Sequence, residues 1–500
     1  MKNKDININS SFGTKAILVV AILVLINVVA GMYYFRADLT KDQRYTLSEG
    51  TKAIVEDLED VLTIKAFITD NLNAEFDNHR REVINILEEY RELSNGNIQL
   101  EIINPVEDEE KQEAMQLGIQ QVSLQEQAKD KLEVETAFLG VAFEMGSQTD
   151  VIPVLAPNAP IEYPITKSIY KVANEIKQKV GLITGHKEIS KAQMPQLAQE
   201  AEVFYQFEDV KLDGTSNLSD YKALLWINPQ DTVDAKELKL VDDYMAAGGG
   251  LLVAYTNAMM GGGGQNQPIM FNDLSGPFEN WINTKGIEFE NSVVFDVNAQ
   301  DVPISVFEQR RIYYFPVIQS FGDHLSTKGL SVLTLQLSSP MLYTGSGSFT
   351  PLLLTSEMSG RENMPVLFDL NKQWTEDEFT EKGITLGGAI EDGNQKMVVI
   401  ANGEFIANGQ GQGQQMQQIN PGNVSFILNS IDWLSGNTQL TQLRGKGIKS
   451  VPIENVEEGK RNTYKYVNFL LPLLLIVLYG FIRFQSKKAK RQKWKEMSSN

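Results

Sequence analysis

Two apolar runs near the ends of the chain constrain its fold more than any other feature. The first, AILVVAILVLINVVAGMYYF, covers residues 16–35 and contains no charged residue. At a rise of ~1.5 Å per residue, such a run forms a helix of ~30 Å, which matches the hydrocarbon thickness of a bilayer. The second, YVNFLLPLLLIVLYGFI, lies within residues 465–483. We therefore predict two transmembrane helices that anchor the chain in one membrane at two points.

The charges that flank the two runs predict which side of the membrane the rest of the chain occupies. Lys and Arg are retained in the cytoplasm when a segment inserts. Residues 1–15 carry three lysines and one aspartate, and residues 483–500 carry seven basic residues and one glutamate. Between them remain 35 basic and 62 acidic residues, a net charge of −27. We expect cytoplasmic tails at 1–15 and 484–500, and a large acidic region on the periplasmic side of the inner membrane.

A cleaved signal peptide is the alternative interpretation of the first run. Val28-Val29-Ala30 before Gly31 is a small-residue sequence of the kind that is processed. The apolar run continues beyond it through three aromatic residues to full spanning length, which favours a retained helix. The middle of the chain lies outside the cytoplasm in both interpretations, but a mature N-terminus at Gly31 would remove the first anchor.

The absence of cysteine excludes several kinds of site. A chain without cysteine has no disulfide framework, no thiolate metal site and no cysteine nucleophile. Its histidines, His79, His186 and His324, are far apart in sequence, so we predict neither a histidine metal site nor a bound cofactor. The acidic surface would repel nucleic acid. About 430 residues lie between the apolar runs, which is enough for two or three domains.

Residues 36–155 are expected to form a first α/β domain. We predict a helix capped by Thr46 or Ser48, then strands at 61–69 and 97–105, helices at 80–94 and 107–117, and a strand pair within 138–155 joined at Gly146-Ser147. The order β-α-β-α-β-β is similar to that of a thioredoxin-like domain, but no C-x-x-C motif is present. The acidic run EDEEKQE at 107–113 is a candidate cation site, although we favour a solvated helix start.

Residues 178–445 are expected to form a second, larger α/β domain. Three prolines mark residues 156–177 as an irregular inter-domain segment in which helical spacing resumes at 165. Beyond it we predict strands at 180–184, 204–212, 223–228 and 251–255, with helices at about 192–202 and 234–248. Alternating strands and helices of this kind indicate a largely parallel sheet with helices on both faces.

The remainder of the second domain has a less regular pattern. We predict a short helix in FENWINTKG, strands at 287–296, 311–318, 331–337, 351–355 and 397–400, a low-complexity loop at 409–418 and an apolar-faced helix at 423–434. This pattern indicates a mixed, antiparallel-rich β extension. Residues 446–464 are polar and form the linker into the second apolar run.

Seven motifs in a fixed order carry a resemblance to a known family. They are RYTLSEGTKAI, EYPITKSIYKVANEI, VGLITGHKE, YKALLWINP, YMAAGGGLLVAY, PLLLTS and NVSFILNSIDWLSG. None is diagnostic alone, but together they resemble the ABC-transporter auxiliary family and, within it, the gliding-motility-associated auxiliary protein of the GldG type. The resemblance covers nearly the whole region between the apolar runs. It implies a non-catalytic subunit, often described as a substrate-binding component, that works with a separate permease and ATP-binding subunit.

The second domain also resembles class I glutamine amidotransferases and their non-enzymatic relatives, which raises the alternative of an enzyme. Those enzymes require a nucleophilic cysteine on a tight turn after a strand, with a histidine partner. Here the turn after LLVAY is Thr256-Asn257-Ala258, and the sequence places no base beside Thr256. We therefore expect a doubly wound, non-catalytic domain and no enzymatic activity.

His186 is the one ligand-binding candidate that the sequence offers. It stands just past an expected strand, in GHKE, where open α/β sheets commonly bind ligands. We favour the simpler interpretation of a solvent-facing turn histidine. The glycine runs at 261–264 and 345–347 lack the endings and spacing of phosphate-binding loops, so we expect ATP hydrolysis to belong to another chain.

These observations predict an inner-membrane accessory protein of an ABC transporter. Its periplasmic domains would bind a ligand or other envelope proteins, and its two helices would contact the permease and the lipid bilayer. One alternative is a structural envelope scaffold without a transport role. Another is a receptor for a sugar or a peptide, which requires a concave pocket that the sequence does not locate.

Overall fold

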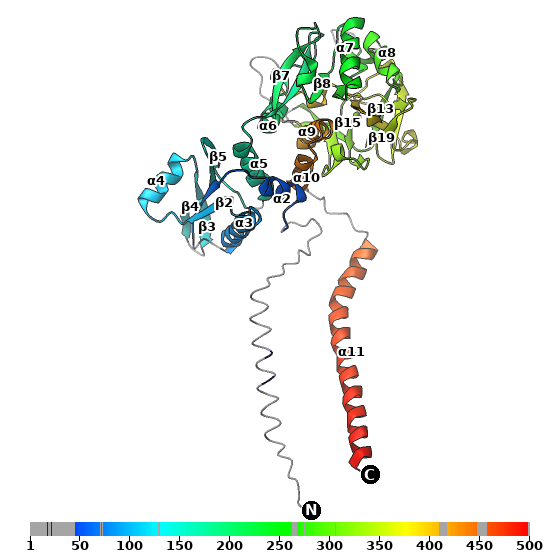
Figure 1. The fold of residues 1–500 in the computed structure, drawn as a ribbon. Coiled ribbons are helices and arrows are strands. Elements are labelled where there is room, and N and C mark those ends of the chain that lie inside the picture. The colour runs from blue at the N-terminus through cyan, green and yellow to red at the C-terminus, as the bar shows by residue number, and fades with distance from the viewer. Residues whose placement is uncertain are drawn as a thin grey trace, which may run out of the picture. The chain divides into compact units, whose positions relative to one another are not determined.

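The computed structural model describes residues 46–447, except 71, 73, 129–130, 158, 263–267, 275, 306 and 410–417, together with residues 458–498, Leu18 and Ile22. The chain divides into two units, Met1–Lys449 and Ser450–Asn500. Their helices and strands are labelled in Figure 1. The described elements make the chain a mixed α/β protein with several sheets.

The first part of the larger unit is built on a mixed five-stranded sheet. Its elements are α2 (Glu49–Glu56), β1 (Leu62–Ile68), α3 (Ala74–Leu93), β2 (Ile98–Ile103), α4 (Asp108–Gln116), β3 (Gln121–Ala128), β4 (Lys131–Met145), β5 (Gln148–Ile152) and α5 (Glu162–Ala173). The strand order is β2-β1-β4-β3, and β5 pairs with the C-terminal part of β4. Strands β1 and β2 are parallel, whereas β4 is antiparallel to β1, β3 and β5. Every element expected here is present, and β3 is an addition that the sequence pattern did not predict.

Side-chain caps explain where two of these helices begin. Ser48 Oγ accepts a hydrogen bond of 3.1 Å from Thr51 N at the start of α2. At α4, the side chains of Glu107 and Glu110 form a reciprocal capping box with the backbone. Such caps satisfy N–H groups that the helix itself leaves unpaired. Two members of the acidic run 107–113 therefore act as a helix start.

Helix α5 lies in the segment that was expected to connect the domains. It packs against β4 and β5, and its Glu162 Oε1 accepts hydrogen bonds of 2.6 Å from Ser48 N and from Thr51 Oγ1. On its other side, Lys167 Nζ lies 2.7 Å from Glu200 Oε2 of α6 (Pro195–Phe204). The helix begins before the predicted residue 165, and it links the two sheets through packed contacts.

The second part of the larger unit is built on an eight-stranded sheet with the order β16-β19-β22-β23-β9-β8-β6-β7. Its first elements are β6 (Gln178–Thr184), η1 (Lys191–Gln193), α6, β7 (Tyr205–Lys211), η2 (Leu218–Asp220), β8 (Ala223–Ile227), α7 (Ala235–Ala246) and β9 (Gly250–Ala254). The five strands from β23 to β7 pair in parallel. The remaining three continue the sheet in antiparallel fashion. The predicted parallel sheet is confirmed for this five-stranded half.

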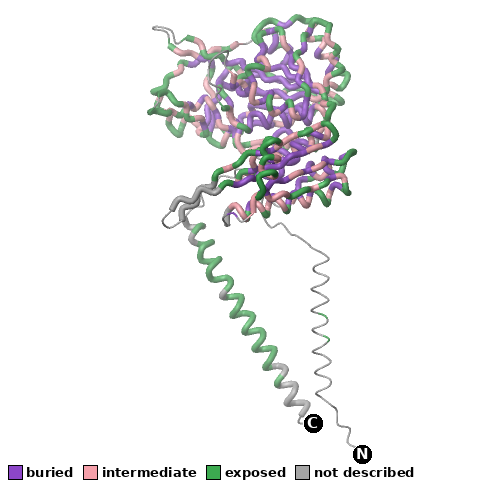
Figure 2. The backbone as a smooth tube through the Cα atoms, turned by 90° about the vertical axis from the view of Figure 1, so that its left-hand side faces the viewer, coloured by how far each residue is buried: buried purple, intermediate pink, exposed green. Residues whose placement is uncertain are grey.

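Alternate residues of the parallel strands pack into two separate cores. Leu225 and Ile227 of β8 pack in the cluster that contains side chains of α6 and α9 (Pro421–Ser435). Leu224 and Trp226 of the same strand pack with side chains of α7 and α8 (Pro277–Thr284). Side chains alternate between the faces of a strand. Both faces of the sheet are therefore buried by helices, and Figure 2 shows in purple how much of the backbone is buried.

A region of short strands connects β9 to β23 and α9. Its elements are β10 (Ala258–Gly261), β11 (Met270–Asp273), α8, β12 (Ile287–Phe289), β13 (Ser292–Asp296), β14 (Ala299–Ser305), β15 (Glu308–Ile318), β16 (Ser320–Phe321), η3 (Leu325–Thr327), β17 (Leu333–Thr334), β18 (Met341–Tyr343), β19 (Ser348–Leu354), β20 (Ser359–Asn363), β21 (Val366–Leu367), η4 (Glu376–Glu378), β22 (Thr385–Asp392), β23 (Gln395–Ile400) and η5 (Glu404–Ile406). Residues 287–296, expected as one strand, form β12 and β13, which pair with different partners. Of the strand expected at 331–337, only β17 has regular strand pairing, although Leu335 N and Leu337 N also donate hydrogen bonds to backbone carbonyls of β15.

Helix α10 (Thr438–Gly447) joins the two ends of the larger unit. It packs against α2 as well as against α5 and α9, and α2 and α10 lie together in Figure 1. At Gly50 of α2 an added Cβ would lie 2.3 Å from the carbonyl oxygen of Gln439. The two helices therefore meet with backbone against backbone at this glycine. Residues 446 and 447, which were predicted to begin the linker 446–464, are the last two residues of α10.

The smaller unit contains α11 (Glu458–Ser498), a helix of 41 residues. Its segment Thr463–Lys488 is long and apolar enough to cross a membrane. This segment covers the second predicted span, 465–483, and Pro472 lies inside the helix. The basic residues predicted to form a separate tail from 484 continue the same helix up to 498. The first predicted span, 16–35, lies outside the described residues apart from Leu18 and Ile22.

Candidate functional site

The carboxyl edge of the parallel strands is the part of the fold where a ligand site is expected. Numbered by their order along the chain, the strands β7-β6-β8-β9-β23 have the order 2-1-3-4-5. In open sheets of this doubly wound order, ligands bind beyond the carboxyl ends of the strands, where the strand order reverses. Here the reversal lies between β6 and β8. His186 follows β6, and Asn228 follows β8.

His186 is buried at this edge between two carboxylates. Its Nδ1 lies 3.1 Å from Glu188 Oε1, and its Nε2 lies 3.1 Å from Glu237 Oε2. Glu188 is itself fixed, because its Oε1 accepts a 3.0 Å hydrogen bond from Trp226 Nε1. The expectation of a solvent-facing turn histidine is therefore wrong, since His186 is 7% exposed. A ligand-binding role for His186 stays a prediction, and it would require one carboxylate to move away.

A cavity of about 240 Å³ lies beside this cluster and is named here the carboxyl-edge cavity. Its polar lining consists of Asn228, Gln230, Thr256, Gln336, Asn402 and Glu404. Its apolar lining consists of Ala258, Met259, Met260, Leu274, Phe315 and Leu337. Three of the polar residues follow the ends of β8, β9 and β23 closely in sequence: Asn228, Thr256 and Asn402.

A chain of hydrogen bonds holds these three strand ends together. Asn228 Oδ1 accepts a 3.2 Å hydrogen bond from Thr256 N, and Thr256 Oγ1 accepts a 2.7 Å hydrogen bond from Gly403 N. A Cβ on Gly403 would lie 2.4 Å from Asn228 Cβ. Glycine at 403 therefore allows β8 and β23 to approach closely at this edge. Thr256 acts here as a structural hydrogen-bonding residue.

Backbone strain and an unpaired polar atom also occur at the carboxyl-edge cavity. Asn228 and Leu337, which both line it, have φ angles of 57° and 47°. This left-handed conformation is strained for residues other than glycine, above all for a bulky one, and such strain tends to cluster at functional sites. Asn402 is 1% exposed, and its Oδ1 accepts no hydrogen bond from any described residue. A buried acceptor of this kind is usually paired in native proteins.

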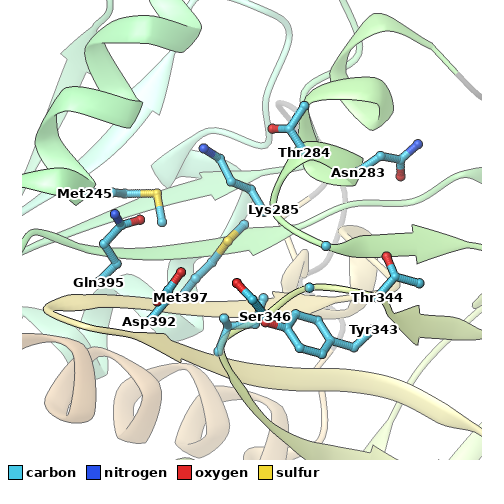
Figure 3. A pocket seen from close by; sticks show the side chains of 13 residues that line it. Met245, Asn283, Thr284, Lys285, Tyr343, Thr344, Ser346, Asp392, Gln395 and Met397 are labelled. Carbon is cyan, nitrogen blue, oxygen red and sulfur yellow. The ribbon is translucent and has the colours of Figure 1, made fainter.

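A second cavity, of about 360 Å³, lies near the opposite edge of the sheet (Figure 3). Met245, Lys285, Tyr343, Asp392 and Met397 are among its lining residues. Lys285 is already engaged, because its Nζ lies 2.6 Å from Asp242 Oδ1 and 5.3 Å from the centroid of the Trp281 ring. The ammonium group of Lys285 is therefore already paired with a carboxylate of the protein itself.

A third cavity, of about 630 Å³, is bordered by α2, α5, α10 and the turn between β4 and β5. Its carboxylates, Asp57, Glu59, Asp60 and Glu175, are all exposed to solvent. Among the described residues, no group of three or more histidine, aspartate or glutamate side chains is placed to hold a metal ion. Of these three cavities, the carboxyl-edge cavity is the one that combines the ends of parallel strands, a left-handed backbone and an unpaired buried acceptor, and we take it as the candidate site.

The chain is similar to one protein sequence and to two solved structures. A protein of Borreliella burgdorferi, described only as uncharacterized, is 20% identical over 98% of this chain and 99% of its own length. Among solved structures, the "mmIFT52 N-terminal domain" has a TM-score of 0.34 at 13% identity, covering 51% of this chain and 96% of that one. A putative ThuA-like protein from Parabacteroides merdae has a TM-score of 0.30 at 12% identity, covering 55% and 94%. Likenesses this distant do not inform function.

Two family models match the chain. A domain of unknown function matches residues 41–144, from just before α2 to the end of β4. A second model matches residues 177–430, which is just over half of the 500-residue chain and includes the carboxyl-edge cavity. Its description is an ABC-type uncharacterized transport system. The chain therefore belongs to this family of ABC transport system auxiliary proteins.

Proposed function

We propose that the chain is a non-catalytic, membrane-anchored auxiliary subunit of an ABC transporter. Membership of the family supports association with a transport system, and α11 contains a segment able to cross a membrane. In this proposal the α/β body binds a ligand or envelope proteins in the periplasm. A separate permease and ATP-binding subunit carry out transport and ATP hydrolysis.

The observation that carries this proposal is the contact between α2 and α10. Helix α2 is the first described helix after the first apolar run, and α10 is the last helix before the linker to the second. The close approach at Gly50 fixes these two ends of the body to each other. In this proposal, a ligand or partner that binds the body acts on the anchors through this pair of helices. Coupling requires that the ligand or partner prefers one of the two states.

The strand orders support the finer parts of the fold prediction. In the first sheet a parallel β1-α3-β2 unit is followed by the antiparallel pair β4 and β5, as in a thioredoxin-like domain. In the second sheet the 2-1-3-4-5 order, with helices on both faces, suits a doubly wound, amidotransferase-like domain. Thr256 occupies the turn where those enzymes carry their nucleophile, and its Oγ1 is bonded to the backbone of Gly403. This arrangement supports a non-enzymatic role.

The proposed topology is two-pass, with both termini in the cytoplasm. The chain has no cysteine, so single cysteines can be introduced without background labelling. Ile176, which is 93% exposed in the body, and Arg491, which is exposed on α11, are suitable positions. We expect an impermeant maleimide to label Ile176→Cys from the periplasm and Arg491→Cys only after lysis of the inner membrane. Labelling of Ile176→Cys only after lysis would refute the topology, and mass spectrometry of the N-terminus tests whether the first span is retained.

Purification of the tagged chain in a mild detergent tests the partner assignment. Recovery of a permease and an ATP-binding subunit is the expected result. Their absence, with other envelope proteins recovered instead, would favour the structural scaffold. The link to gliding motility is the finest part of the proposal and rests on the resemblance of the sequence motifs. Deletion of the gene in its own host should abolish surface movement. Normal movement of the deletion strain would refute the link to gliding motility and leave the transporter role untouched.

A further inference from the structure

We propose that the carboxyl-edge cavity binds a small, uncharged ligand that carries hydroxyl groups on a ring with an apolar face. This inference rests on the proposed function, because it names the class of ligand that the auxiliary subunit would take. It follows from the unpaired polar atoms, the charges, the size and the apolar wall of the cavity.

The unpaired polar atoms of the lining call for a group that both donates and accepts hydrogen bonds. Asn402 Oδ1 is a buried acceptor without a donor among the described residues. Asn228 also lines the cavity, and its amide carries a donor, Nδ2, besides the Oδ1 that accepts from Thr256 N. A hydroxyl group donates one hydrogen bond and accepts others, so a ligand with several hydroxyls can satisfy both. An ammonium group has three donors and no acceptor, so it could pair with Asn402 Oδ1 but not with a donor such as Asn228 Nδ2.

The charges around the cavity disfavour an anion. Its described lining contains no lysine, arginine or histidine, and its one ionisable group is the carboxylate of Glu404. His186 beside it is already held between Glu188 and Glu237. A phosphate or carboxylate would therefore enter the cavity without a cation to pair with, which is strongly unfavourable. A neutral ligand meets no such cost.

The size and the apolar wall limit the ligand to one small ring or one unit of a longer chain. The cavity of about 240 Å³ equals the volume of about eight waters at ~30 Å³ each. It is smaller than the ~300–1,000 Å³ of sites for drug-sized ligands. Met259, Met260 and Phe315 are part of its lining. Methionine side chains adapt to the shape of what they contact, so they suit the apolar face of a ring.

Three probes with the same six-membered ring and different charge test the assignment. They are glucose, which is neutral, glucosamine, which is cationic, and glucuronate, which is anionic. Binding is measured by ligand-observed NMR on the full chain in a zwitterionic detergent without a sugar headgroup. We expect saturable binding of glucose with a Kd on the order of 1 mM. Glucuronate should bind at least about tenfold more weakly, because its charge has no partner in the cavity.

Two variants inside the cavity and one outside it locate the binding. Met260→Trp fills the cavity at a residue that is 42% exposed, so the fold should tolerate the change. Asn228→Asp keeps the acceptor for Thr256 N and the left-handed backbone but removes the donor and adds a charge. Both should weaken glucose binding about tenfold or more. Met358→Trp alters a similarly exposed methionine that does not line the cavity, and it should bind glucose as the unmodified chain does.

Each outcome decides for or against the assignment. No saturable glucose signal up to about 100 mM, which is far above a weak Kd of ~1 mM, would overturn it. Equal binding by the Met260→Trp variant would overturn the location, and binding of glucosamine alone would overturn the neutral class. The measurement needs no permease or ATP-binding subunit. Failure to recover those partners would therefore refute the proposed transporter role and leave the binding result intact.

Discussion

Arg444 of α10 and Asp432 of α9 form an ion pair whose side chains are only 3% and 0% exposed. Asp432 also accepts hydrogen bonds from the Tyr205 hydroxyl and, at 3.1 Å, from Thr441 Oγ1. Arg444 Nε donates to Asn429 Oδ1 at 3.0 Å. Burial lowers the pKa of the Arg444 guanidinium below its ordinary value. This network connects α10 to α9 and to the start of β7.

Arg444→Met should destabilise the body strongly. Removing one member of a buried pair leaves the other charge uncompensated, which typically costs about 3–5 kcal/mol. The double variant Arg444→Met, Asp432→Leu removes both charges and should be less destabilised than the single one. Chemical denaturation of Arg444→Met, of Asp432→Leu and of the double variant measures the difference. A double variant that is as unstable as the two single variants added together would show that the pair itself contributes nothing.

Gly50→Ala should weaken the contact between α2 and α10. The new Cβ would lie 2.3 Å from Gln439 O, so the helices would have to separate. Overpacking of this kind costs about 1–3 kcal/mol. Gly276→Ala is the matched control, because its Cβ would have only an ordinary contact of 3.6 Å with Leu274 O. If both variants melt at the same temperature in calorimetry, close packing at Gly50 has no energetic importance.

Gly403→Ala should disturb the carboxyl-edge cavity. Its Cβ would meet Asn228 Cβ at 2.4 Å and push the ends of β8 and β23 apart. We expect a loss of stability of about 1–3 kcal/mol. We also expect a weaker hydrogen bond from Gly403 N to Thr256, because the two strand ends would separate. Amide hydrogen exchange at position 403 and at Thr256 should therefore become faster than in the unmodified chain, and unchanged exchange would contradict the tight junction.

The alkaline stability of the body should depend on Tyr255. Burial raises the pKa of its hydroxyl to about 12. Between the ordinary value near 10 and about 12, the unfolded chain loses this proton while the folded chain keeps it. Stability contributed by the neutral form is therefore complete below pH ~10 and is lost as the pH rises through that window. Between pH ~10 and ~12, the free energy of unfolding should fall less steeply with pH in the Tyr255→Phe variant, by the equivalent of about one proton. Denaturation curves measured from pH 9 to about 12 test this. An unchanged slope would indicate that Tyr255 ionises normally.

Much of the second sheet could be predicted from the sequence because its strands are short apolar runs separated by amphipathic helices. The runs that became β6, β8 and β9 are buried on both faces, so their composition alone indicates a parallel sheet. The pairing of β23 with β9 could not be predicted, because it joins Gln395–Ile400 to Gly250–Ala254 across a long insertion of short strands. The positions of those short strands depend on the strands with which they pair more than on the pattern of their own sequences.

Helix α10 was missed because its sequence is polar and ends in two glycines. TQLTQLRGKG has a weak helical pattern, and its stability comes from burial of Leu440, Leu443 and Arg444 against α2 and α9. Strand β3 was missed for a similar reason, since QVSLQEQA is mostly polar and is held by pairing with β4. In both segments tertiary contacts outweigh local preference.

The lining of the candidate site was not predicted from the sequence. His186 follows β6 at the edge where the strand order reverses, but it does not line the carboxyl-edge cavity, whose polar lining includes Asn228, Thr256 and Asn402. A signal for these residues was present, because each is a polar residue directly after or near the end of a buried strand. The left-handed backbone of Leu337 and the unpaired Asn402 oxygen arise from the assembled fold and have no signature in the sequence.

The pairing of α2 with α10 has a consequence for biosynthesis. Glu49–Glu56 leaves the ribosome early, and Thr438–Gly447 is made only after almost the entire body. At ~5–20 residues per second, the first helix waits roughly 20–80 s for its partner. During that time α10 cannot cover the backbone around Gly50, so this contact forms only after most of the chain has been translated.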